Sequence, residues 1–214
     1  GAVKGVGEAA VQSIMEERKK NGPFLGIFDF VQRVNLNACN KKNMECLALA
    51  GGFDSFPELK REQYFAANSK GELFLETLMR YGNRYQADKA AAVNSLFGGE
   101  NVIDVATPEI PQGVERWSDL DRLNRERDLV GIYLSAHPLD EFSIVLEHVC
   151  NTRMSELEDK AALAGREITM GGIVTSVRRG VSKNGNPYGI AKIEDYSGST
   201  EIPFWGNDWV TYQG

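Results

Sequence analysis

The sequence is poor in the residues that bind metals or form disulfides. Its 214 residues include three cysteines (Cys39, Cys46 and Cys150), an odd number without a C-x-x-C pair. This pattern predicts neither a disulfide framework nor a zinc site, and we interpret all three as reduced thiols of the core. The two histidines, His137 and His148, have no partners at metal-ligand spacing, so we assign them capping or packing roles.

Long apolar runs and targeting signals are also missing. No stretch approaches the roughly 18 apolar residues that span a bilayer, and no basic-then-apolar leader stands at the N-terminus. We therefore expect no membrane partner and a cytoplasmic location. The chain starts at Gly1 rather than methionine, which indicates a piece of a longer protein.

Acidic residues outnumber basic ones, with 30 Asp and Glu against 24 Lys and Arg. The net charge of -6 argues weakly against a general nucleic-acid binder. The acidic excess lies in residues 61–160, which hold 18 acidic and 11 basic side chains, whereas both ends of the chain are nearly balanced. Any contact with a polyanion is therefore expected at the ends.

Hydrophobic periodicity predicts a helical first half. A helix over 8–20 is expected to end at Asn21-Gly22-Pro23. Further helices are expected around 27–34, after Asn40 up to Gly51-Gly52, and as a pair within 59–97. The expected inward-facing residues are Ala10, Val11, Ile14 and Met15 in the first helix, Met44, Leu47 and Leu49 after Asn40, and Phe74, Leu78, Tyr81 and Tyr85 in the last.

The residue composition and the hydrophobic periodicity change in the second half of the sequence. Residues 98–112 contain glycines and prolines without periodicity and are typical of a linker. Ser118 and Asp121 have capping-box spacing, and the helix they start must end by His137, because proline follows. After residue 167, β-branched and aromatic residues with two glycine turns predict three antiparallel strands. Too few strands remain for a closed barrel, so this end is interpreted as truncated.

The glycine pair near the N-terminus raises a functional hypothesis. Gly5 and Gly7 flank Val6 directly before a predicted helix, and Lys4 precedes them. A helix N-terminus has backbone N–H groups without intrahelical partners and attracts anions, and glycines let a phosphate approach closely. Such a turn can hold a DNA backbone phosphate without reading sequence. A plain helix-entry turn explains the spacing equally well.

Three longer stretches resemble one known family. "GVGEAAVQSI", "GPFLGIFDFVQRV" and "NKKNMECLALAGGFDSF" resemble the tandem helix-hairpin-helix module of the alpha subunits of bacterial DNA polymerase III. "RERDLVGIYLSAHPLDEF" is similar to the segment that follows this module, and "GGIVTSVRRGVSKNGNPYGIAKIEDYSGSTEIPFW" to the first strands of the family's OB-fold.

The resemblance implies an α+β fold in three parts. These are a helix-hairpin-helix module (1–97), a linker with connecting helices (98–160) and a partial OB-fold (161–214). It implies a DNA-binding fragment of a replicative polymerase, a nucleotidyltransferase. Its partners would be DNA, the sliding clamp and other polymerase subunits. The family's magnesium-binding palm lies upstream, so no catalysis and no cofactor are expected in this fragment.

The same resemblance assigns duplex-binding residues. Lys4, Gly5, Val6 and Gly7 would hold a backbone phosphate, with Gly51 and Gly52 as a second hairpin. Asp54 follows that second pair and would repel a phosphate, so we expect it to be weaker or purely structural.

Basic and aromatic residues of the predicted strands suggest single-strand binding, since OB-folds combine basic grooves with base stacking. The candidates are Arg178, Arg179, Lys183, Tyr188 and Trp205. A core position is the alternative for each aromatic residue, and the favoured one for Phe204. Adjacent arginines on a strand point to opposite faces, so at least one should reach solvent.

A clamp-binding peptide is expected at the end of the helical module. Val93, Asn94, Ser95, Leu96 and Phe97 fall on the family's motif, with Val93 in place of its glutamine, which should weaken binding. The alternative is a helix end that packs Leu96 and Phe97 on the core.

Two other function classes compete with this interpretation. NAD-dependent DNA ligases, which act in repair, also combine helix-hairpin-helix and OB units, but in the opposite order and with a four-cysteine zinc module that this sequence lacks. A protein-interaction scaffold without DNA contact is compatible with the acidic middle of the chain.

Overall fold

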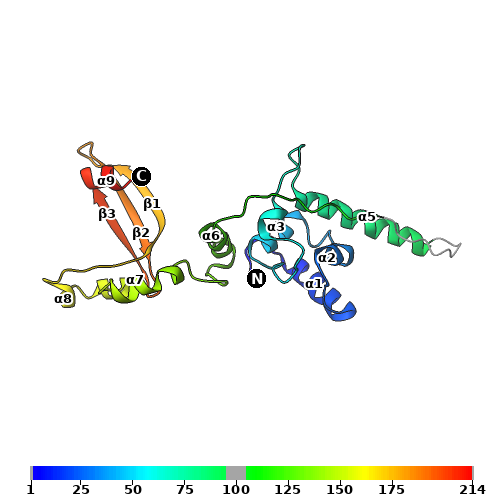
Figure 1. Ribbon diagram of the computed structural model, residues 1–214, viewed down its shortest axis with the longest axis horizontal. Coiled ribbons are helices and arrows are strands. Elements are labelled where there is room, and N and C mark those ends of the chain that lie inside the picture. Colours follow the sequence, from blue (N-terminus) through cyan, green and yellow to red (C-terminus); the bar gives the residue numbers. More distant parts are fainter. Residues whose placement is uncertain (1, 95–104, 214) are drawn as a thin grey trace. The chain divides into compact units, whose positions relative to one another are not determined.

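The computed structural model describes residues 2–94 and 105–213, and the chain divides into two compact units, Gly1–Ser135 and Ala136–Gly214 (Figure 1). The chain is mixed α+β, as predicted, with helices in the first unit and a three-stranded antiparallel sheet in the second. The division does not coincide with the predicted boundaries after residues 97 and 160. The helix that starts at Asp119, which we placed in the connecting segment, lies in the first unit.

The helices of the first unit follow the predicted order. They are α1 (Glu8–Asn21), α2 (Ile27–Arg33), α3 (Lys41–Leu49), α4 (Arg61–Tyr64), α5 (Phe74–Asn94) and α6 (Asp119–Val130). The side chains of Asn40 and Ser118 cap α3 and α6, because each accepts a hydrogen bond from the backbone N–H three residues later. Gly131, at φ +93, ends α6.

The core of the first unit lies between α2, α3 and α5. Gly82 lets α2 and α5 approach closely, since a Cβ there would lie 2.6 Å from the carbonyl oxygen of Val31. Rings from separate segments pack beside this contact, with the Phe30 and Phe53 centroids 5.1 Å apart. The predicted inward residues that are buried are Ala10, Met44, Phe74, Leu78 and Tyr81.

The prediction for the apolar face of α1 was wrong in part. Of its four expected inward residues, only Ala10 is buried, and Ile14 is half-buried. Val11 and Met15 are 39% and 56% exposed. Helical periodicity identified an apolar stripe, but the neighbouring elements cover only one edge of it.

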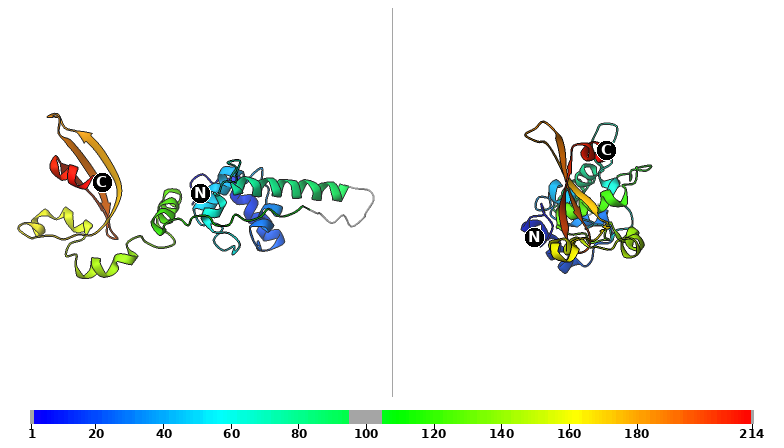
Figure 2. Two further views of the ribbon diagram at one scale, coloured as in Figure 1. Left: turned by 45° about the horizontal axis from the view of Figure 1, so that its top comes forward. Right: turned by 90° about the vertical axis from the view of Figure 1, so that its left-hand side faces the viewer.

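The second unit is built around the predicted strands (Figure 2). Its elements are η1 (Asp140–Phe142), α7 (Ser143–His148), η2 (Met154–Glu158), α8 (Lys160–Leu163), β1 (Ile173–Val181), β2 (Pro187–Glu194), β3 (Ser199–Trp205) and α9 (Asn207–Tyr212). The strand order is β1-β2-β3, and Gly180, Tyr188 and Trp205 stand in one cross-strand row. The assignment of this sheet to an OB-fold stays a prediction.

Candidate nucleic-acid interface

The first hairpin, residues 4–7, is anchored at both ends. The Lys4 N–H donates to the carbonyl of Leu129 in α6 at 2.8 Å. The Gly7 N–H donates to the side-chain oxygen of Asn43 in α3 at 3.0 Å. Between them Gly5 adopts φ +82, and a Cβ there would lie 2.6 Å from the Cys46 sulfur. The hairpin is therefore held between α3 and α6, and Gly5 is required by the fold.

Gly7 is different from Gly5 because the fold does not need a glycine there. Gly7 is the N-cap of α1, with an ordinary φ of −73°, and a Cβ would meet no atom within 4 Å. The space over the start of α1 is thus open to a ligand.

Unpaired donors surround that space. Within the described residues, the backbone N–H groups of Gly5, Glu8 and Ala9 have no hydrogen-bond acceptor. A helix N-terminus with free N–H groups carries a partial positive charge that favours anions. Lys4 is exposed beside these groups, and the Cε of Lys42 would lie 3.9 Å from a Cβ on Gly5. The structure thus places two lysines at the hairpin.

The sequence analysis missed two of these residues. Lys42 is the second residue of α3, after the capping Asn40. Two consecutive lysines at the start of a predicted helix could have marked it as a candidate anion contact. Asn43 is 6% exposed, and its amide also donates to the Ala38 carbonyl and to Asn40. No sequence pattern distinguishes a buried bridging asparagine from an exposed one.

Gly51 and Gly52 lie at the end of α3 rather than at the start of a helix. Their N–H groups donate to the carbonyls of Ala48 and Leu47 at 3.2 and 2.7 Å, a paired bonding pattern that caps a helix C-terminus. Both donors are therefore occupied, which favours the structural role over the phosphate-binding one. The turn between helices α2 and α3 is formed by residues 34–40.

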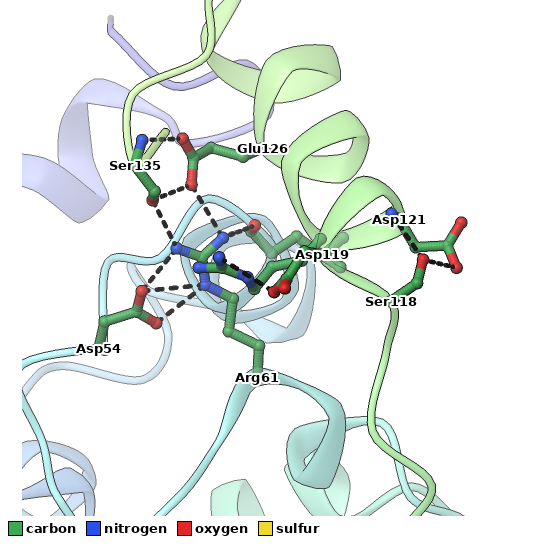
Figure 3. Close-up of polar contacts among 9 residues, drawn as sticks. Asp54, Arg61, Ser118, Asp119, Asp121, Glu126 and Ser135 are labelled. Carbon is green, nitrogen blue, oxygen red and sulfur yellow. Dashed lines mark hydrogen bonds and ion pairs between the residues drawn. The ribbon is translucent and has the colours of Figure 1, made fainter. Parts of the chain in front are cut away.

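A buried ion pair joins α4 to α6 (Figure 3). Arg61 is 5% exposed and Glu126 is fully buried, with Nη1 and Oε2 3.0 Å apart. Arg61 also binds both oxygens of Asp54, and Ser135 bonds to both partners of the pair. A Cβ on Gly51 would overlap the Arg61 guanidinium, so Gly51 is required for this pair as well as for its φ of +79.

Glu126 is held in its charged form. Burial raises its pKa, but hydrogen bonds from Ser135, from the Leu134 N–H and from Arg61 outweigh burial and leave the pKa below the ordinary glutamate value. Buried charges require such compensation, because an unpaired buried charge is strongly unfavourable. The network therefore fixes α6 and residues 134–135 to the rest of the unit.

One face of the sheet, which we call the aromatic face, collects three of the predicted single-strand residues. Tyr188 and Trp205 pair across β2 and β3, with ring centroids 5.0 Å apart, and Trp205 is 56% exposed. Arg178 lies on the same face by register, and so does Lys192, which the sequence analysis missed. Side chains alternate between the two faces along a strand, so Lys192, four positions after Tyr188, could have been placed on the same face from the sequence alone.

The other two candidates lie elsewhere. Arg179 is on the opposite face, where its guanidinium lies 5.7 Å from the ring centre of Trp209. Lys183 is exposed in the turn between β1 and β2. Arg178 is exposed but forms an ion pair with Glu201. The arginine pair thus points to opposite faces, as expected, and only Arg178 shares a face with Tyr188 and Trp205.

The remaining predicted sites are outside what the structure tests. Val93 and Asn94 belong to the last turn of α5, while Ser95, Leu96 and Phe97 lie outside the described residues.

In the described part of the chain, no helix is long and apolar enough to cross a membrane. The same residues contain no group of three or more acidic, cysteine or histidine side chains that could hold a metal.

Comparison with known proteins decides between the families considered above. Residues 1–64 match the profile of the helix-hairpin-helix motif. The chain is 32% identical over 206 residues to the DNA polymerase III subunit alpha of Pasteurella multocida, covering 96% of this chain and 17% of that protein. The chain is homologous to one segment of these alpha subunits.

Similar polymerase alpha subunits come from other bacteria as well. That of Mycobacterium tuberculosis (strain H37Rv) is 31% identical over 219 residues, which cover 99% of this chain and 18% of that protein. That of Vibrio cholerae is 32% identical over 207 residues, covering 94% and 17%. The chain therefore spans less than a fifth of the length of the curated relatives that it matches.

Proposed function

We propose that this chain is the DNA-binding segment of a bacterial replicative polymerase alpha subunit and that the first hairpin holds a phosphate of duplex DNA. The observation that carries the proposal is the start of α1. There the free N–H groups of Gly5, Glu8 and Ala9 surround an open space beside Lys4 and Lys42. Backbone donors and lysines bind phosphate oxygens regardless of base sequence, as a polymerase that copies any template requires.

The aromatic face is the proposed site for single-stranded template. An aromatic pair with one exposed and one half-buried ring, beside basic side chains, can stack bases and attract the backbone. Tyr188 and Trp205 supply the rings and Lys192 the positive charge. Arg178 is paired with Glu201 on the same face and would have to exchange this partner for a phosphate. Arg179 and Lys183 belong to a different surface, so their contribution is expected to be smaller.

The polymerase activity itself is proposed for the whole protein and not for this segment. Nucleotidyl transfer would depend on a magnesium-binding palm domain elsewhere in the protein, and this segment would contribute DNA binding. Contacts with the sliding clamp through residues 93–97, and with further polymerase subunits, remain part of the proposal.

A salt titration of duplex binding tests the hairpin assignment. Affinity of the 214-residue chain for a short duplex should fall steeply with salt, because each neutralised phosphate contributes a slope of about −0.9 in log–log form. Lys42→Gln should weaken binding to all sequences alike and reduce the slope by about one unit. Lys70→Gln is the matched control, because Lys70 is exposed in the same unit but distant in sequence from the hairpin.

Equal effects of the two lysine substitutions would reject the hairpin assignment. The absence of any salt-dependent duplex binding would instead favour the protein-interaction scaffold, since a protein-packing module has no phosphate contacts to titrate.

A further inference from the structure

We infer that the buried Arg61–Glu126 pair positions the first hairpin for phosphate binding, although neither side chain belongs to the DNA-contacting surface. This inference rests on the proposed function. It assigns a positioning role to α6 and the residues after it. We call Glu126 and Leu129 of α6, together with Ser135, the brace. The sequence analysis had placed this helix in a mere connecting segment.

The brace is linked to the hairpin by a backbone hydrogen bond. Leu129 lies in the last turn of α6, where carbonyl groups have no partner within the helix. Its carbonyl accepts the N–H of Lys4 at 2.8 Å, directly before Gly5. The position of α6 therefore determines where the hairpin begins.

The ion pair in turn determines the position of α6. Glu126 lies one helical turn before Leu129, and its carboxylate contacts Arg61 from α4 and the N–H groups of Leu134 and Ser135. Arg61 is itself fixed by Asp54 and by the Leu49 carbonyl at the end of α3. Since α3 holds Gly7 through Asn43, the two anchors of the hairpin are coupled through this network.

This arrangement gives a role to a costly feature, a buried ion pair in the unit that carries the hairpin. A buried ion pair gives little net stability compared with apolar side chains, but it accepts only one geometry. A phosphate grip made of backbone N–H groups needs its donors fixed before the ligand arrives, because ordering them on binding would lower the affinity. Positioning of the hairpin is therefore the role that this pair fits.

The direction in which duplex affinity changes on removal of a negative charge separates this positioning role from long-range electrostatics. Glu126→Gln removes one negative charge, so long-range attraction alone would strengthen duplex binding by the 214-residue chain. If the pair positions the hairpin, the same substitution should weaken binding by about tenfold, comparable to misplacing one phosphate hydrogen bond. The Lys4 amide should also exchange with solvent faster, a change that needs no DNA to measure.

A second ion pair in the same unit provides matched controls. Arg33 binds Glu17 and Asp29 and donates to the carbonyls of Gly22 and Pro23, at the end of α1 distant from the hairpin. Glu17→Gln changes the net charge as Glu126→Gln does. Arg61→Gln removes the other partner of the buried pair and should also raise Lys4 exchange, and Arg33→Gln is its matched control. Both controls should leave Lys4 exchange unchanged and should not weaken binding tenfold.

A milder variant covers the case in which the pair variants do not fold. Ser135→Ala removes only the hydroxyl that bonds to both charged partners, and it should raise Lys4 exchange and weaken binding in the same direction. Unchanged Lys4 exchange, or faster exchange with unchanged affinity, would overturn the positioning role alone. Absence of duplex binding by the unsubstituted chain would reject the proposed function, and this role with it.

Discussion

Gly5 and Gly7 flank one valine in the first hairpin, and the space around their α-carbons differs. At Gly5 the fold itself forbids a side chain, because of the positive φ and the Cys46 sulfur. At Gly7 the space is open. A requirement for glycine at Gly7 would therefore come from a ligand, whereas a requirement at Gly5 would come from packing.

The substitution Gly7→Ala tests this difference. We expect duplex affinity to fall several-fold while the free energy of unfolding falls by no more than about 1 kcal/mol, the effect of replacing a favourable N-cap residue by alanine. Gly5→Ala should lower stability as well as affinity. Calorimetry and a duplex titration measure the two quantities, and an unaltered affinity of the Gly7→Ala variant would contradict the phosphate assignment.

Glu126 predicts a dependence of stability on pH. Its folded-state pKa lies below the ordinary value of 4.5, so the unfolded chain takes up the proton first as the pH falls. Its contribution to stability is therefore complete above about pH 4.5 and is lost as the pH falls through the lowered folded-state pKa. Urea unfolding between about pH 6 and pH 3 should show this loss.

The Glu126→Gln variant separates this carboxylate from the others. It should be less stable than the unsubstituted chain near neutral pH and should approach it in acid, because glutamine does not titrate. A constant difference in unfolding free energy at every pH would mean that the charge of Glu126 contributes nothing.

At the scale of elements, α9 packs on the sheet most closely at Gly189. Trp209 is 6% exposed, and its ring lies where a Cβ of Gly189 would be, within 2.1 Å. Gly189→Ala should displace α9 and destabilise the second unit by about 1–3 kcal/mol, as overpacking does. Gly198→Ala is the control, because its Cβ would meet only the Ser155 nitrogen, at 3.9 Å. The unfolding midpoint and the indole NMR signal of Trp209 measure the effect.

The aromatic face gives a second prediction at this scale. Trp205→Ala should reduce affinity for a short single strand by about 1–3 kcal/mol, the contribution of one stacked base. Tyr212→Ala removes another exposed ring from the same unit, on α9, and should have little effect. Single-strand titrations of both variants at one salt concentration are the measurement. Equal losses would point to nonspecific aromatic contact.

At the scale of the whole molecule, the two units differ in how much core they contain. The first has a continuous cluster of buried apolar side chains, while the second buries few, among them Leu139, Met154, Ala191 and Trp209. Hydrophobic stabilisation grows with buried apolar area, so the second unit should unfold at lower denaturant concentration. Leu78→Ala should destabilise the first unit by about 2–5 kcal/mol.

Residue-resolved hydrogen exchange in urea would measure the two unfolding transitions separately. Amides of α2 and α5 should lose protection earlier in Leu78→Ala, while those of β2 should keep their midpoint. A single transition that shifts as a whole would contradict independent folding of the units.

Local patterns predicted much of this architecture. Helical periodicity, the capping Asn40 and Ser118, and the change to β-branched residues after position 167 anticipated the helices of the first unit and the three strands, because these signals act over a few neighbouring residues. The short helices of the second unit were not anticipated. The resemblance to polymerase alpha subunits was likewise present in the linear sequence. Periodicity failed for Val11 and Met15, since it identifies an apolar stripe and not what covers it.

Tertiary structure alone decided which residues meet. Arg61 and Glu126 are 65 positions apart, Gly7 and Asn43 are 36 apart, and no local rule pairs them. The glycines illustrate the same division. The sequence indicated that Gly5, Gly7, Gly51 and Gly52 lie at helix ends, because glycine has a low helix propensity and is favoured in turns and caps. Only the folded chain decided that Gly51 makes room for Arg61 and that Gly7 faces open space, because those roles depend on atoms brought there from distant segments.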